Sequence, residues 1–136
     1  MKGAFSEHEV YSKAIQENLV THATMLGIRV IPEFDNPGHT RAVGLDPAFG
    51  DIIRCFNKDW ANNLPGAFKI NGGPPTGVLD PSMDKTYDLL KDIFSSFDES
   101  FPDAMVHLGG DEVFTSCFNE NPNIQTFMRE KKLNTY

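Results

Sequence analysis

The feature that most constrains the fold is a pattern that occurs twice: an amphipathic helix, a short apolar strand and an acidic loop. In the first copy, apolar side chains recur at helical spacing over residues 12–26, and residues 28–34 follow as a strand rich in branched side chains. In the second copy, a helix over 80–100 precedes a strand at 104–108. Alternating helices and strands favour parallel strands with right-handed crossovers. The predicted fold class is therefore α/β.

Residues with strong positional preferences mark the expected helix ends. Ser12 is a good N-cap for the first helix, and Gly27 suits the left-handed residue that follows a helix. Asp80 is predicted as the N-cap of the second helix, with Pro81 at its first position. A third helix is expected to start at Asn121-Pro122. The apolar stripe of the second helix comprises Met83, Tyr87, Leu90, Phe94 and Phe97.

A long connection rich in proline and glycine, residues 41–79, separates the two copies. A stretch of this length without secondary structure is uncommon in a compact domain, so we expect a functional loop over a site. A flexible linker between two domains is the alternative. It is disfavoured because neither side alone contains enough apolar elements for a complete core.

Composition narrows the class of protein. The chain has 136 residues, of which 40% are hydrophobic and 23% charged, which is typical of one globular domain. Its formal net charge is −7 and no basic run is present, so no nucleic-acid partner is expected. No stretch approaches the roughly 18 apolar residues of a membrane span, and the N-terminus does not resemble a signal peptide.

Both strands end in polar loops, at residues 35–40 and 109–112. Loops that leave the carboxyl ends of parallel strands lie at one edge of the sheet, so their side chains are expected to converge. The converging candidates are Asp35, His39, Asp111 and Glu112. Two adjacent carboxylates in a cleft disfavour each other's ionisation, so one is expected to hold a proton, as a general acid requires. For an isolated Asp-Glu pair, a solvated loop is the commoner explanation.

The two cysteines, Cys55 and Cys117, lie too far apart in sequence for a metal motif of the Cys-x-x-Cys kind. Their spacing alone is equally compatible with two separate thiols and with one disulfide. A bridge that closes a loop of this length would stabilise the fold by roughly 4 kcal/mol in the chain-entropy model. It would also indicate an oxidising compartment.

Two long segments, residues 29–40 and 107–113, resemble the signature segments of family 20 glycoside hydrolases, the β-N-acetylhexosaminidases. The segments 79–82 and 101–103 fit the pattern of the lysosomal animal members. The resemblance implies a (β/α)8 TIM barrel that releases terminal N-acetylglucosamine or N-acetylgalactosamine with retention. A complete barrel needs about 250 residues. Residues 1–136 are therefore interpreted as an internal fragment of this catalytic domain, a partial barrel of two to three β/α units.

The resemblance also implies roles for the polar residues. Glu112 is expected to act as general acid and base, and Asp111 to orient the 2-acetamido group of the substrate, whose oxygen is the nucleophile. His39 is expected to contact Glu112. Asp35 is expected to orient the site from behind these residues or to have a purely structural role. No cofactor and no metal are expected, and the two cysteines are expected to be bridged as in the lysosomal members.

Partners and a location follow from the same resemblance. The expected substrates are N-acetylhexosamine-terminated glycans or glycoconjugates, the expected location is lysosomal or secreted, and the parent enzyme is compatible with a dimer. Missing barrel units would leave strand edges and apolar helix faces uncovered. The fragment alone is therefore expected to be unstable or to associate, with little or no activity.

Two other functions are compatible with the sequence. A metal-dependent hydrolase on a similar barrel would use as ligands Glu33, Asp35, His39, His107 and Asp111, although no tight His-x-His spacing is present. Otherwise His107 is interpreted as a packed or barrel-lining side chain. The second alternative is a non-catalytic product of a truncated gene, and the presence of both Asp111 and Glu112 argues against it.

Overall fold

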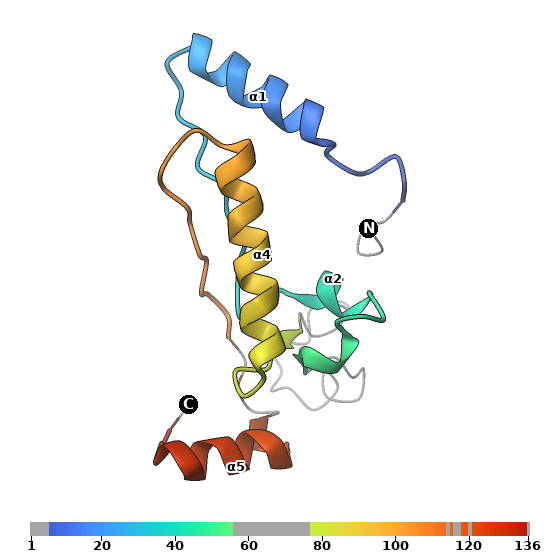
Figure 1. Ribbon diagram of the computed structural model, residues 1–136, viewed down its shortest axis with the longest axis vertical. Helices are drawn as coiled ribbons and strands as arrows, with labels where there is room; N and C mark the ends of the chain where they lie inside the picture. Colours follow the sequence, from blue (N-terminus) through green and yellow to red (C-terminus); the bar gives the residue numbers. More distant parts are fainter. Residues whose placement is uncertain (1–5, 56–76, 114, 116–117, 120, 136) are drawn as a thin grey trace, which may run out of the picture.

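The computed structural model describes residues 6–55, 77–113, 115, 118–119 and 121–135. Its elements are α1 (Lys13–Met25), α2 (Arg41–Gly44), a 3-10 turn η1 (Gly50–Ile52), β1 (Ile53–Arg54), β2 (Val78–Leu79), α4 (Asp84–Ser100) and α5 (Pro122–Lys131). In Figure 1, α4 runs along the middle of the molecule, α1 crosses near one end of it and α5 lies near the other. None of the described helices is long and apolar enough to cross a membrane.

The two segments expected as parallel strands lie side by side and run in the same direction. Glu33 and His107 form a parallel bridge. The His107 N–H donates to the Pro32 carbonyl at 2.9 Å, and the Phe34 N–H donates to the His107 carbonyl at 3.3 Å. Pro32 has no N–H to extend a ladder. The predicted parallel direction is confirmed, whereas the predicted strands at 28–34 and 104–108 are reduced to this bridge in the described residues.

The connection between the two copies contains secondary structure, which its composition did not predict. Its described part forms α2, η1, β1 and β2, and the two strands pair antiparallel. Ile52 and Leu79 are fully buried and pack against Leu90 of α4. Burying an apolar side chain stabilises a fold by about 1.5–3 kcal/mol, so this part belongs to the core. Residues 56–76 lie outside the described part, and a loop over the site there stays a prediction.

The start of α4 differs from the prediction because Asp80 has other partners. Its side chain is fully buried and accepts hydrogen bonds from the N–H and the hydroxyl of Ser82. A guanidinium nitrogen of Arg54 lies 2.6 Å from its other carboxylate oxygen. Since the carboxylate is engaged in this turn and ion pair, the N-cap position passes to Met83. Pro81 therefore precedes the helix instead of opening it.

The apolar stripe of α4 is confirmed except at one position. Leu90 packs on the buried core, and the Phe94 ring meets Phe34 edge to face at a centroid distance of 6.4 Å. Phe97 extends this aromatic row. Tyr87 is exposed instead of packed, and its hydroxyl donates to a backbone carbonyl of the preceding turn. The polar end of a tyrosine favours such a position at the edge of an apolar face.

The predicted caps of α1 and α5 are confirmed. The Ser12 hydroxyl accepts a hydrogen bond from the Ile15 N–H, and Gly27 follows α1 with a φ of +73°. The Asn121 side chain accepts from two N–H groups in the first turn of α5, and Ile124 is buried. By contrast, the apolar stripe of α1 is largely uncovered by the described residues. Ile15, for example, is about half exposed.

A bidentate ion pair joins the beginnings of the two parallel segments. Arg29 donates two hydrogen bonds to the Asp103 carboxylate, at 2.6 and 2.8 Å. These hydrogen bonds lower the pKa of Asp103. A carboxylate whose pKa is lower in the folded state stabilises the fold above its unfolded-state pKa, and this contribution is lost as the pH falls through the folded-state value.

We therefore expect Asp103→Asn to lower the free energy of unfolding at neutral pH, with a difference from wild type that shrinks below about pH 4. Chemical denaturation at neutral and acidic pH measures this difference. Asp98→Asn, a matched change at an exposed residue of α4, is the control. If the two proteins differ in free energy of unfolding by the same amount at every pH, the ionised Asp103 carboxylate does not stabilise the fold through Arg29.

Candidate active site

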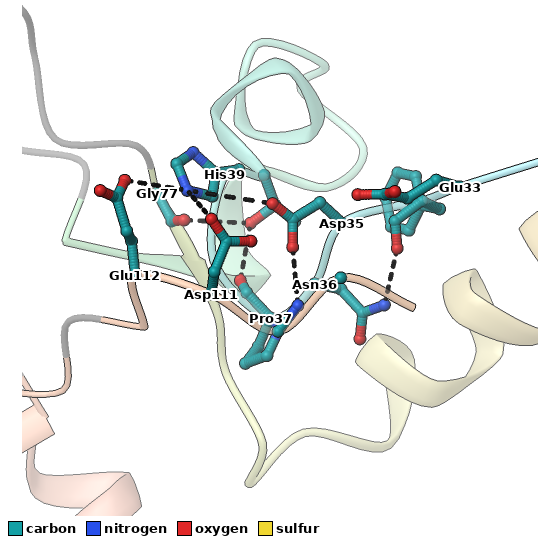
Figure 2. Close-up of polar contacts among 12 residues, drawn as sticks. Glu33, Asp35, Asn36, Pro37, His39, Gly77, Asp111 and Glu112 are labelled. Atoms are coloured by element: carbon teal, nitrogen blue, oxygen red, sulfur yellow. Dashed lines mark hydrogen bonds and ion pairs between the residues drawn. The ribbon is translucent and has the colours of Figure 1, made fainter. Parts of the chain in front are cut away.

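Four polar side chains meet at the exits of the two parallel segments, around the imidazole of His39. Its Nε2 atom lies 3.3 Å from Oε2 of Glu112. The same atom lies 3.9 Å from Oδ2 of Asp111 and 3.9 Å from Oδ2 of Asp35. Figure 2 shows these contacts converging on the ring. The structure thus brings together all four residues that were predicted to converge, although the two loops lie about 70 residues apart.

The loop that carries His39 is held by the strand β2 and the residue before it. Thr40 is buried, and its hydroxyl lies 3.1 Å from the carbonyl of Pro37 and 3.3 Å from that of Gly77. The Thr40 N–H also donates to the Gly77 carbonyl, and the Leu79 N–H donates to the Pro37 carbonyl at 2.8 Å. These hydrogen bonds satisfy the buried polar groups of the loop and so fix its conformation.

The turn that carries the two adjacent carboxylates depends on glycine and on Asp35. Gly109 has a φ of +67°, and a Cβ atom at this residue would overlap the Asp35 carboxylate. The next N–H, that of Gly110, donates to Oδ1 of Asp35 at 3.0 Å. Asp35 thus binds the backbone of the turn with one oxygen and faces His39 with the other. These contacts are compatible with both predicted roles of Asp35, orienting the site and holding the backbone, and the choice between them stays a prediction.

Two of the four residues have a backbone conformation that residues other than glycine rarely adopt. The φ angles are +56° for His39 and +49° for Glu112, both in the left-handed region. This region costs a residue other than glycine about 1–2 kcal/mol. Such conformations persist where the surrounding structure enforces them, and they cluster at functional sites.

His107 was predicted to be a packed or barrel-lining side chain; among the described residues it is not packed, and barrel lining stays a prediction. Its side chain is 65% exposed among the described residues, and Nδ1 lies 3.0 Å from Oε2 of Glu33, whose side chain is 51% exposed. The prediction relied on the apolar neighbours of His107 in sequence. Because side chains alternate between the two faces of an extended segment, those neighbours do not determine its surroundings.

Three residues of the proposed metal-ligand set lie close enough together to hold a cation. One ligand atom from each of Asp35, His39 and Asp111 lies within 4.8 Å of the others. Glu33 and His107, the other two members, pair with each other instead. Exposed carboxylates often gather in this way without an ion, so the geometry alone does not establish a metal site.

Cys55 is buried beside Val78 and Ile124, in a small apolar cluster near the start of α5. It is disulfide-bonded. Cys117 lies outside the described residues, so the pairing that the resemblance implied stays a prediction.

Comparison with known proteins shows which protein family the chain belongs to. The sequence profile described as "Glycosyl hydrolase family 20, catalytic domain" matches residues 1–136. The chain therefore belongs to glycosyl hydrolase family 20. Among curated relatives, it is 38% identical to the beta-hexosaminidase subunit beta of Felis catus over 96% of the chain, and 37% identical to that of Homo sapiens over 98%. It covers 22% of each relative, so the chain spans about a fifth of their length.

Solved structures show the same similarity. A chitobiase of Flavobacterium johnsoniae is 30% identical and superposes with a TM-score of 0.73, over 96% of this chain and 18% of that one. An exo-β-N-acetylglucosaminidase of Vibrio harveyi, solved in complex with N-acetylglucosamine, superposes with a TM-score of 0.68 at 23% identity, over 93% of this chain and 18% of that one. The arrangement of the described elements is therefore that of a family 20 enzyme.

Proposed function

We propose that this chain supplies the acid/base centre of a retaining β-N-acetylhexosaminidase with a (β/α)8 barrel. The observation that carries the proposal is the contact of one imidazole with two adjacent carboxylates at the ends of parallel segments. His39 lies 3.3 Å from Glu112 and 3.9 Å from Asp111. Membership of family 20 and the N-acetylglucosamine complex of a structural relative support the same substrate class.

In the first step, Glu112 would protonate the glycosidic oxygen while the carbonyl oxygen of the substrate's 2-acetamido group attacks the anomeric carbon. The bond to the leaving group breaks and an oxazolinium intermediate forms. Asp111 would accept a hydrogen bond from the acetamido N–H, which orients the carbonyl for attack and stabilises the developing positive charge. This mechanism needs two neighbouring carboxylates with different roles.

In the second step, Glu112 would take a proton from a water molecule, which attacks the same anomeric carbon. The oxazolinium ring opens, the acetamido group is restored, and the sugar leaves with its original anomeric configuration. Two inversions at one carbon give net retention. His39 would hold the Glu112 side chain in place through both proton transfers, because the two groups are in contact.

The full-length enzyme that contains this segment tests the proposal. It is expected to hydrolyse an aryl N-acetyl-β-glucosaminide and to be inhibited by a thiazoline that mimics the oxazolinium ring. Dialysis against a chelator is expected to leave the rate unchanged, because no proton transfer above uses a metal. Inactivation by the chelator would favour the metal-dependent alternative instead. Absence of hydrolysis would favour a non-catalytic product.

The remaining parts of the proposal concern the parent enzyme. Its substrates are glycans or glycoconjugates that end in N-acetylhexosamine, its location is lysosomal or secreted, and its architecture is compatible with a dimer. The isolated segment is expected to be unstable or to associate, with little or no activity. This expectation is supported by the exposure of apolar side chains on both parallel segments, namely Ile28, Ile31, Met105, Val106 and Leu108.

A further inference from the structure

The histidine at the parallel bridge contacts the same turn that carries the catalytic carboxylates. Because Glu33 and His107 are bridge partners, their side chains leave the pair on one face. His107 Nδ1 lies 3.0 Å from the Glu33 carboxylate and accepts a hydrogen bond from the Gly109 N–H at 3.2 Å. Gly109 is separated from Asp111 by a single residue, so this contact bears on the direction of both carboxylates.

Two side chains therefore hold consecutive amides of the turn. His107 accepts from the Gly109 N–H, and Asp35 accepts from the Gly110 N–H. The turn has no side chains of its own at these two positions, and φ values of +67° and +107° give it a conformation that only glycine adopts readily. Its direction is therefore set by the groups that bind its N–H donors.

Glu33 and the Gly109 amide compete for the same imidazole nitrogen of His107. A nitrogen atom either carries a proton or offers a lone pair, so Nδ1 serves Glu33 as a donor or Gly109 as an acceptor, and not both at once. The ring lies within reach of both partners. When Nδ1 carries no proton, it accepts from the Gly109 N–H, and this is the state of the ring that holds the turn.

We infer that His107 is a positioning residue for the proposed reaction, acting through the hydrogen bond that its Nδ1 atom accepts from the Gly109 N–H. The Nδ1 acceptor fixes the Gly109 amide, and the fixed turn aims Asp111 and Glu112 at the sugar. The inference rests on the proposed function, and it adds a second support to the turn besides Asp35. It does not require His107 to touch the substrate.

Paired variants of the full-length enzyme test the inference. His107→Leu keeps the size of the side chain but removes the acceptor, so kcat on the aryl glycoside is expected to fall about 100-fold, as for other misplaced catalytic groups. KM is expected to stay within about threefold, because the loss falls on the transition state. His107→Asn is expected to restore kcat to within about fivefold of wild type, because asparagine readily accepts from the N–H two residues on.

His22, an exposed histidine on α1, supplies the matched control: His22→Leu is expected to leave kcat unchanged. Thermal unfolding of each variant separates loss of fold from loss of positioning. A folded His107→Leu enzyme with wild-type kcat overturns the inference, and so do leucine and asparagine variants that are equally slow. If the leucine variant does not fold, the asparagine variant decides alone: kcat near wild type supports the inference, and a 100-fold loss overturns it.

Adding a Glu112→Gln variant separates the failure of this inference from the failure of the proposed function. A Glu112→Gln enzyme that keeps full activity overturns the proposed function and, with it, the role of His107. An inactive Glu112→Gln enzyme beside a fully active His107→Leu enzyme overturns only the positioning role.

Discussion

Glu112→Gln is expected to lower kcat of the full-length enzyme by about 10²- to 10⁴-fold, the range that general acid–base catalysis supplies. Glutamine preserves the size of the side chain and its contact with His39, but it has no proton to give to the glycosidic oxygen. Steady-state hydrolysis of an aryl N-acetyl-β-glucosaminide measures the loss. The first step should recover with a nitrophenolate leaving group, because a weakly basic oxygen departs without protonation.

Glu130→Gln, the same change at an exposed residue of α5, is the control and should be neutral. A Glu112→Gln enzyme whose kcat/KM falls equally for every leaving group would contradict proton donation by this residue, because kcat/KM reports the cleavage step. It would instead point to a steric or structural role for the side chain. A uniform loss in kcat would not contradict proton donation, since Glu112 also acts on water in the second step whatever the leaving group.

Gly109→Ala is expected to abolish most activity and to destabilise the fold. The left-handed backbone alone costs alanine about 1–2 kcal/mol. The added methyl group would also overlap the Asp35 carboxylate and backbone, and relief of such overpacking costs about 1–3 kcal/mol more. Because Asp35 faces both the turn and His39, its displacement should disorder the whole site. Denaturant unfolding and kcat of the full-length enzyme measure the two effects.

Gly27→Ala separates backbone strain from the clash. Gly27 has a φ of +73°, close to that of Gly109, but a Cβ atom there meets no atom of the described residues within 4 Å. This variant should lose only the strain energy and keep wild-type kcat. If the two alanine substitutions change the free energy of unfolding and kcat equally, then Asp35 moves aside without harm to the site. Its proposed support of the turn would then be wrong.

The elements that sequence patterns predicted correctly are those with local causes. Ser12 and Asn121 cap their helices with atoms of the same turn, so residue type and position suffice. Asp80 is also a good capping residue by type, yet its carboxylate binds Arg54, which lies 26 residues earlier, and the helix begins after it. A partner brought close only by tertiary folding overrides a local preference, and no pattern within one helix reveals it.

The candidate site also has features that the sequence predicted and features that it did not. Convergence of His39 with Asp111 and Glu112 was predictable, because strand order and direction place loop ends at a common edge. The groups that hold these residues were not predictable. Thr40 binds the backbone carbonyl of Gly77, and every residue has such a carbonyl, so residue type gives no signal. The pair of Glu33 and His107 likewise emerges only from the register of the bridge.

The hydrogen bond from Gly110 to Asp35 spans 75 positions, and its neighbour from Asn36 to the Leu108 carbonyl spans 72. Ribosomes add about 5–20 residues per second, so roughly 4–15 s separate the synthesis of the two halves. In the nascent polypeptide, His39 therefore has Asp35 beside it but lacks its contact with Glu112 until the glycine turn leaves the exit tunnel. The proton-transfer centre can assemble only after that turn has been made, because neither half of the segment contains both His39 and the carboxylate pair.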